Sequence, residues 1–287
     1  VELHVYKKAL KIIGAENIAE SSVGGAVVKG NYIESINSRT NAVYIQGIAA
    51  TIENNTIISD GVAIQIQPYG NNIGGNVKNN NLSAYRYSIW HNYDMANSGE
   101  WIYDGNHLTT REPDSLEVYR ESAAPPYSWR GILISTGSPN IEFKNNTIDG
   151  SNAFQDGIVN GEYWSDVIGI QFYSNLNEAS AIDIHDNIIT DVTIGIQDGA
   201  GQADLDQILA KNDFPDEFIV LGNEIKMPED GTIYNQNSGI IYNTIQAAID
   251  DAVAGNNVIK VFPGDYGTDP IDIIQKAGVN ITLEAVG

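Results

Sequence analysis

The feature that most constrains the fold of this chain is a short pattern that occurs seven times. Each copy contains an apolar-x-apolar triplet, two or three polar residues, an asparagine, any residue, and then Ile or Leu. The marker asparagines lie 24, 25, 26, 40, 41 and 36 residues apart, at Asn31, Asn55, Asn80, Asn106, Asn146, Asn187 and Asn223. A unit of this size with short alternating strands cannot bury its apolar face alone, whereas stacked units can. The spacing therefore predicts a solenoid.

A second alternating segment lies between the markers. It occurs at residues 43–47, 63–67, 88–90, 132–134, 168–171 and 194–197. Each coil should therefore contribute at least two strands with every second residue pointing inward. The composition agrees, because 41 Ile against 11 Leu, with 31 Asn and 28 Gly, favours strands and turns over helices.

The marker asparagines are expected at the corners between strands. Asn tolerates a left-handed φ, and its amide bonds to neighbouring backbone. Stacked one above another, the seven amides should form a ladder. We predict a structural role for them and no ligand-binding role.

The repeats resemble the right-handed parallel β-helix proteins of the pectin-lyase-like kind over nearly the whole chain. A leucine-rich repeat, the main competitor, would need Leu-x-x-Leu-x-Leu blocks that are missing from this sequence. We therefore expect an all-β right-handed parallel β-helix over residues 1–242. The enlarged spacings predict loop insertions at 109–130, 150–166 and 199–217.

The pattern changes after Tyr242. Residues 243–255 predict one short amphipathic helix, with Asn243 as its N-cap, Gln246 at the capping-box position and Gly255 at C′. A strand at 258–266 follows and ends in a turn. In the pectin-lyase-like proteins, such a helix and a strand ending in Pro-Gly-x-Tyr look like the opening of a coil stack.

Residues 271–285 also resemble residues 1–15. Residues 243–287 are thus interpreted as a capping helix plus strands that resemble the start of a next β-helix unit. Two hypotheses give end-to-end stacking: the chain is one period of a longer array, or it self-associates head to tail. The alternative is a helix that folds over its own C-terminal end.

Charge and composition exclude several classes of partner. With 37 acidic and 15 basic residues the net charge is -22, which disfavours nucleic acid and anionic membrane surfaces. The absence of cysteine excludes disulfides, thiolate metal sites and a thiol nucleophile. No long apolar run or signal-like segment occurs, so we expect a mature or excised soluble piece that is extracellular or displayed at a cell surface.

Aromatic residues concentrate around the first two predicted insertions, and all four tryptophans lie between residues 90 and 164. A sugar ring stacks its C–H face on an aromatic ring while its hydroxyls take polar partners. Tyr127, Trp129, Tyr163 and Trp164 are the preferred carbohydrate-binding residues, and the expected partner is a polysaccharide or cell-wall glycan. The alternative is that these rings fasten the loops to the coils, as we expect for Trp90 and Trp101.

Candidate catalytic residues are weaker. A glycosidase needs two carboxyl groups about 5 to 10 Å apart. A lyase that acts on uronates resembles a different design, in which carboxylates hold Ca²⁺ and a cationic base lies near the substrate. The candidates are Asp156, Glu162, Asp166 and Arg130, with Asp114, Glu117 and Arg86 nearby. The sequence lacks the Arg-x-Pro-x-x-Arg pattern of pectate lyases and the Gly-His-Gly and Arg-Ile-Lys motifs of polygalacturonases. This favours a module that is not an enzyme.

No cofactor is required by these patterns. Asp198, Asp204 and Asp206 form a candidate Ca²⁺ site, because hard cations prefer oxygen ligands. The sequence predicts a non-catalytic extracellular module, in a surface layer, array or filament, that contacts carbohydrate. The alternative is a polysaccharide lyase or glycoside hydrolase with a groove along the aromatic loops. A host-attachment spike would need a trimer signature that the sequence does not show.

Overall fold

The computed structural model describes residues 2–4, 10–13, 25–36, 40–69, 73–92, 99–111, 129–135, 137, 140–151, 158–159, 162–163, 167–173, 181–267, 271 and 278–286. Only the backbone is described for residues 2–4, 10–13, 158–159 and 162–163. The chain divides into two compact units, Val1–Phe214 and Pro215–Gly287. Within the described residues, neither helix has the length and apolar character needed to cross a membrane.

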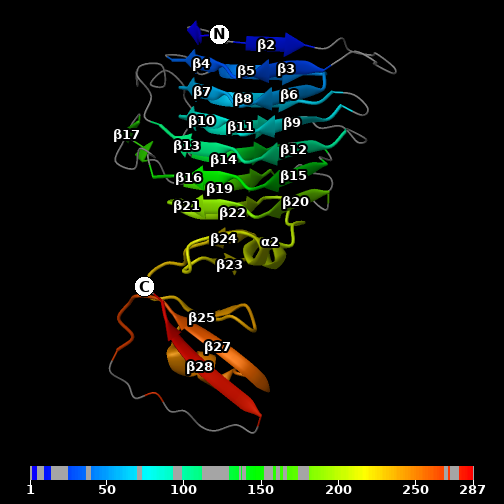
Figure 1. Ribbon diagram of the computed structural model, residues 1–287. Coiled ribbons are helices and arrows are strands. Elements are labelled where there is room, and N and C mark those ends of the chain that lie inside the picture. Colours follow the sequence, from blue (N-terminus) through cyan, green and yellow to red (C-terminus); the bar gives the residue numbers. More distant parts are fainter. Residues whose placement is uncertain are drawn as a thin grey trace. The chain divides into compact units, whose positions relative to one another are not determined.

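The first unit is a stack of coils whose strands form three parallel sheets (Figure 1). Sheet A contains β1 (Glu2–His4), β4 (Tyr32–Ser35), β7 (Thr56–Ser59), β10 (Asn81–Ala84), β13 (His107–Thr110), β16 (Thr147–Asp149) and β21 (Ile188–Thr190). Within this unit, sheet B contains β2 (Leu10–Ile13), β5 (Asn41–Gln46), β8 (Val62–Gln67), β11 (Tyr87–His91), β14 (Trp129–Ile134), β19 (Val167–Phe172) and β22 (Ile194–Asp198). Sheet C contains β3 (Ala26–Lys29), β6 (Ala50–Glu53), β9 (Gly75–Lys78), β12 (Trp101–Asp104), β15 (Ile141–Lys144) and β20 (Ile182–His185).

Each coil runs from sheet C to sheet A to sheet B, so a coil has three strands where the sequence required at least two. The predicted all-β parallel β-helix is thereby confirmed. Matching residues stack in columns, as in the sheet A column of Ile33, Ile57, Leu82, Leu108, Ile148 and Ile189. These side chains are at most 2% exposed. Full burial of each contributes about 1.5–3 kcal/mol, which explains why an apolar residue occupies this position in each of these sheet A strands.

The corner from sheet C to sheet A is a sharp turn with a left-handed residue. The left-handed conformation was predicted for the marker asparagine itself, and this prediction is wrong. The residue before each marker asparagine has the positive φ, between 53° and 65°, at Gly30, Asn54, Asn79, Gly105, Asn145 and Asp186. Gly, Asn and Asp are the residue types that reach this conformation at least cost.

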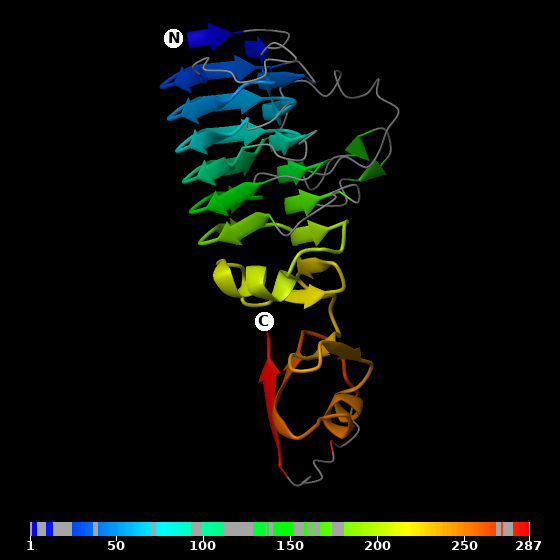
Figure 2. The same cartoon turned by 90° about the vertical axis from the view of Figure 1, so that its right-hand side faces the viewer.

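The third predicted insertion, 199–217, contains a helix. Helix α2 (Leu205–Lys211) occupies the place in the coil where a further sheet C strand would lie, and it contacts β20. Figure 2 shows it lying across the last coil. Asp204 is its N-cap, and Leu205 and Ile208 are buried beneath it. The helix therefore covers the end of the coil stack with an apolar face.

The first two predicted insertions leave from the same corner, between sheets A and B, on successive coils. The first spans the residues between Thr110 and Trp129, slightly less than the predicted 109–130, and the second lies between Asp149 and Val167. Short antiparallel strands β17 (Ile158–Val159) and β18 (Glu162–Tyr163) belong to the second. Other coils make this connection in as few as two residues, as between β7 and β8.

The second unit begins well before the predicted boundary at 242/243. Its elements are β23 (Ile219–Leu221), β24 (Glu224–Lys226), β25 (Ile233–Asn235), β26 (Ile240–Tyr242), α3 (Ile245–Asp250), β27 (Gly255–Val261) and β28 (Val279–Ala285). The pairs β23–β24, β25–β26 and β25–β27 are antiparallel. Parallel coils therefore do not continue to residue 242 as predicted.

Helix α3 is where the sequence placed it, with different caps. Thr244 is the N-cap, and its side chain accepts a hydrogen bond from the amide of Ala247 at 3.1 Å. Asn243 is therefore not the cap, and Gln246 donates to Asp250 at 2.8 Å. Gly255 starts β27 with a φ of 114°. Ala248 and Ile249 pack against Ile233 and Ile259 to form the core of this unit.

Candidate functional site

The asparagine ladder runs along the corner between sheets C and A. The side-chain Nδ2 of Asn80 donates to Oδ1 of Asn106 at 3.0 Å, and the backbone N–H of Asn80 donates to the same oxygen at 3.1 Å. Nδ2 of Asn80 also donates to the carbonyl of Ile52 one coil earlier. Asn55, Asn106, Asn146 and Asn187 repeat this pattern with their neighbours.

Each interior rung therefore uses both amide hydrogens and both lone pairs of its side chain. These asparagines are at most 2% exposed, and a buried amide that is fully hydrogen-bonded avoids the desolvation cost of an unpaired polar group. These interior rungs leave no side-chain polar atom over for a ligand. It is a structural element of the solenoid.

Asn223 is not a rung. It lies with Gly222 in the turn of the antiparallel hairpin β23–β24, and it is exposed. The last rung is Asn212, which accepts from Asn187 and donates to the carbonyls of Ile184 and Ile208. Asn212 is also the C-cap of α2. The signal that was missed is that Asn212 lies 25 residues after Asn187 and has an apolar residue, Phe214, two positions later.

The strongest candidate for ligand contact is the outer face of sheet B. We call Arg86, Tyr87, Trp90 and Arg130 the arginine–aromatic face. The guanidinium carbons of Arg86 and Arg130 lie 5.1 and 5.4 Å from the centre of the Tyr87 ring. The Trp90 ring meets the same ring edge-on, with centroids 5.7 Å apart. Two cations and two aromatic rings are thus gathered on the neighbouring strands β11 and β14, with Arg86 directly before β11.

An irregularity in sheet B brings these rings together. The strand register skips one position in successive strands, occupied by the small residues Ala42, Ala63, Ser88, Gly131, Gly169 and Gly195. Because neighbouring strands leave the ladder at matching positions, the alternation of faces shifts there without the extra residue that defines a β-bulge. Tyr87 and Trp90, three residues apart, consequently contact each other on one face.

Hydrogen bonds hold this face in place. Nε1 of Trp90 donates to Oγ of Ser135 at 2.9 Å, and Nε of Arg130 donates to Oε1 of Gln171. Gln171 in turn donates to Gln197 on the next coil. Arg86, Trp90 and Arg130 are half-buried and Tyr87 is 8% exposed. A ligand would therefore meet the guanidinium groups and the indole, with Tyr87 behind them.

The predicted carbohydrate-binding residues need one correction. Trp129 is 0% exposed and lies in the interior of the first unit, opposite Val167 of the next coil, so it does not contact a ligand. The sequence placed it in a loop, whereas it is the first residue of β14. Tyr127 and Trp164 lie outside the described residues, as does the side chain of Tyr163. Trp101 is buried as expected.

The catalytic candidates are mostly untested by the structure. Asp114, Glu117, Asp156 and Asp166 lie outside the described residues, and so does the side chain of Glu162. Arg130 is described and belongs to the arginine–aromatic face. No pair of carboxylates with glycosidase spacing is thereby established, and the enzyme alternative depends on residues beyond this face.

The three aspartates of the candidate Ca²⁺ site have other partners. The Asp198 carboxylate is 1% exposed and accepts from the amides of Ala200, Gln202 and Ala203 at 2.7–3.0 Å. Asp204 caps α2 through the amide of Gln207 at 3.0 Å, and Asp206 lies in the first turn of α2. Among the residues that the structure describes, no three His, Asp or Glu side chains are grouped as a metal site would require.

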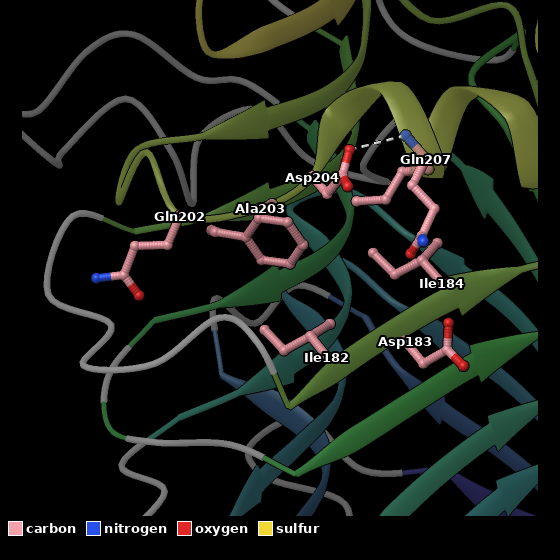
Figure 3. Close-up of a pocket in the computed structure, with 9 residues that line it drawn as sticks. Ile182, Asp183, Ile184, Gln202, Ala203, Asp204 and Gln207 are labelled. Atoms are coloured by element: carbon pink, nitrogen blue, oxygen red, sulfur yellow. Dashed lines mark hydrogen bonds between the residues drawn. The ribbon is translucent and has the colours of Figure 1, made fainter.

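A small pocket lies between α2 and sheet C, with a volume of about 190 Å³ (Figure 3). Its lining is Phe172, Ile182, Asp183, Ile184, Gln202, Ala203, Asp204, Gln207 and Ile208. Ligand pockets usually measure about 300–1,000 Å³. The dashed bond in Figure 3 shows that Asp204 is engaged with the helix. We interpret this pocket as the gap left where a helix replaces a strand.

An ionic cluster lies on the outer face of sheet C near this pocket. Lys144 bonds to Glu142 at 2.7 Å, and the imidazole of His185 lies 2.6 Å from Asp186 and 3.3 Å from Glu142. The hydrogen bond from Lys144 lowers the pKa of Glu142. The hydrogen bond to Asp186 raises the pKa of His185 above 6.5 against the opposing effect of burial, and the bond to Glu142 raises it further. The cluster is a satisfied surface network.

Comparisons of the chain with protein-family models, with curated proteins and with solved structures gave no match. The fold and the site therefore rest on the chain's own residues. Stacked coils whose strands form three parallel sheets define a β-solenoid, and the arginine–aromatic face is the most concentrated set of groups suited to a ligand among the residues that the structure describes.

Proposed function

We propose that this protein is a non-catalytic structural module, outside the cell or at its surface, that stacks end to end and contacts carbohydrate. The observation that supports it is the arginine–aromatic face, where two guanidinium groups flank one tyrosine ring beside a half-buried indole. We further infer that the solenoid is of the pectin-lyase-like kind, on the basis of the helix at 245–250 and the Pro-Gly-x-Tyr segment that follows it.

The chemistry of this face favours an acidic glycan. Sugar C–H groups stack on an indole, and a guanidinium binds a carboxylate through two parallel hydrogen bonds. The chain carries a net charge of -22, so a locally cationic surface stands out against a repulsive background. Uronate carboxylates would supply the attraction that a neutral glycan lacks.

A lyase or glycoside hydrolase is the second candidate. It is favoured by one observation, the placement of Arg130 and Arg86 at the corner from which both long insertions leave. A lyase would use such a cation beside the substrate. The carboxylates that it would also need fall in 112–128 and 152–166, where the structure describes no side chains.

The test is retention on immobilised polygalacturonate, alginate and a neutral glucan, measured by affinity electrophoresis at two salt concentrations. We expect retention on the acidic glycans that weakens with salt, and a loss of about tenfold or more for Arg86→Ala/Arg130→Ala, because each charge-assisted contact is worth about 1.5–3 kcal/mol. Lys226→Ala removes a cation elsewhere and should leave retention unchanged. A wild-type protein that passes all three matrices unretained would refute the carbohydrate role.

The same incubations decide between the two candidates. Release of unsaturated or reducing ends, with and without Ca²⁺, would overturn the non-catalytic proposal in favour of the enzyme. Retention without release supports it.

A further inference from the structure

The last strand of the second unit, β28, has a free edge. The sheet order is β26-β25-β27-β28, so β28 pairs on one side only among the described residues. Most residues of β28 are exposed. Leu283 lies opposite the buried Ile259 of β27, yet it is 41% exposed. A parallel edge strand of seven residues with an exposed leucine is a template for another strand.

The pair β27–β28 has the geometry of two successive coils. It is parallel, and each residue of β28 lies 24 positions after its partner, as Gly255 opposite Val279. The same step of 24 residues relates β3 to β6. Nδ2 of Asn280 donates to Oδ1 of Asn256 at 3.0 Å, an amide contact between coils. The second unit thus presents the start of a coil stack.

The outer face of sheet C carries a column of alternating charge. The register places Lys29, Glu53, Lys78, Asp104 and Lys144 in consecutive coils. Lys29 lies 3.0 Å from Glu53, and Lys78 lies 3.9 Å from Asp104. Opposite charges directly across neighbouring strands are stabilising, whereas like charges are not. Register in this sheet is therefore encoded by charge as well as by apolar residues.

The β27–β28 pair continues the same rule. Lys260 lies opposite Glu284 in the register, and Ile259 lies opposite Leu283 on the other face. Glu284 is at the free edge of one unit, and Lys29 is at the free edge of sheet C in the other, where β3 is the terminal described strand. Among the described residues no charge follows Glu284 or precedes Lys29 in its column, and each of the two has the sign that the other would need.

We propose that β28 of one copy pairs in parallel with β3 of a second copy, with Glu284 opposite Lys29 and Leu283 opposite Val28. This inference rests on the stacking part of the proposed function and names its surface and register. The charge column then reads Lys260, Glu284, Lys29, Glu53 and Lys78 without interruption. The apolar column reads Ile259, Leu283, Val28, Ile52 and Val77, in which the pairing would cover the exposed Leu283 and the other four side chains are buried.

The first experiment is sedimentation velocity of the full chain over a wide concentration range. Wild-type protein should form head-to-tail oligomers, and Leu283→Lys should weaken association at least tenfold, because it places a charge in the paired core. Ile240→Lys is the matched control: Ile240 is 46% exposed on β26, the opposite edge of the same sheet. Circular dichroism checks that both variants fold.

The outcomes separate the inference from the function on which it rests. A wild-type monomer at every concentration overturns both the stacking and the β28 assignment. Association that is unaffected by Leu283→Lys, or equally lost in Ile240→Lys, overturns the assignment to β28 and leaves stacking standing. Retention on glycans is measured separately and does not depend on either result.

The register is tested by exchanging the charges. Glu284→Lys alone and Lys29→Glu alone should each associate more weakly than wild type, because each places like charges together at the junction. An equimolar mixture of the two variants should recover association, because every junction between unlike copies is again Lys opposite Glu. Failure of the mixture to recover would refute the pairing of Glu284 with Lys29.

Discussion

The two corners that flank sheet A differ in how much variation they allow. The corner from sheet C is the same short turn in six coils, with a left-handed residue and then an asparagine. The corner to sheet B ranges from two residues between β7 and β8 to the long connections before β14 and β19. A fully hydrogen-bonded amide must have a partner above and below it, so the first corner cannot change length in one coil alone. Among the described residues the second corner shows no such ladder, and the insertions are found there.

The largest expected effect comes from breaking a middle rung of the ladder. Asn106→Ala removes the acceptor for two donors of Asn80 and the donor to the carbonyl of Val77. At about 1–3 kcal/mol for each buried group left unpaired, we expect a loss of roughly 4 kcal/mol in the free energy of unfolding, measured with urea. Asn81→Ala, at an exposed position of β10, is the control and should be within about 0.5 kcal/mol of wild type. Equal effects would show that the ladder adds nothing.

The corner to sheet B uses an ion pair where the other uses amides. Arg111 lies 3.4 Å from Asp60, which is 0% exposed and two coils away in the register. Arg111→Met should destabilise by about 3 kcal/mol, because it leaves a buried carboxylate without this partner. The double variant Asp60→Asn/Arg111→Met should recover part of the loss. A double variant no more stable than the single one would argue against a charge effect.

The left-handed position gives a smaller and more specific effect. Asn54 has a φ of 56°, and a residue such as alanine pays about 1–2 kcal/mol in that conformation. Asn54→Ala should therefore lower the free energy of unfolding by about that amount, whereas Asn54→Gly should be nearly neutral because Gly30 and Gly105 occupy the same position in other coils. A glycine variant as unstable as the alanine variant would place the role of Asn54 in its side chain.

The same contrast explains what could be predicted from the sequence. Six rungs of the ladder and the parallel coils were predictable from the repeat. The hydrogen bonds between asparagines of successive coils fix the position of each marker, so the repeat is regular there. Asn212 was missed because the triplet that precedes a rung is replaced by helix α2, so only the spacing remained as a signal. Trp129 was misplaced because its strand follows a long insertion, where no repeat fixes the strand start. The contact between Tyr87 and Trp90 depends on a skipped register position, which alternation alone does not reveal.

The smallest expected effect is the pH dependence of the ionic cluster on sheet C. The lowered pKa of Glu142 gives stability that is present above its unfolded value, near 4.5, and lost as the pH falls through the folded value. The raised pKa of His185 gives stability that is present below 6.5 and lost as the pH rises through the higher folded value. Both contributions are present together between about pH 4.5 and 6.5.

Glu142→Gln should flatten both limbs of the stability profile, because Glu142 bonds to Lys144 and to His185. His185→Gln should flatten the limb above pH 6.5 and weaken the acid limb in part, because the hydrogen bond from His185 also lowers the pKa of Glu142. The amplitude should be below about 1 kcal/mol, as for other partly exposed ion pairs, so urea midpoints at half-unit pH steps are compared with wild type. If Glu142→Gln altered only the acid limb, His185 would owe its raised pKa to Asp186 and Asp183 without Glu142, and the cluster would be two independent groups instead of one network spanning two coils.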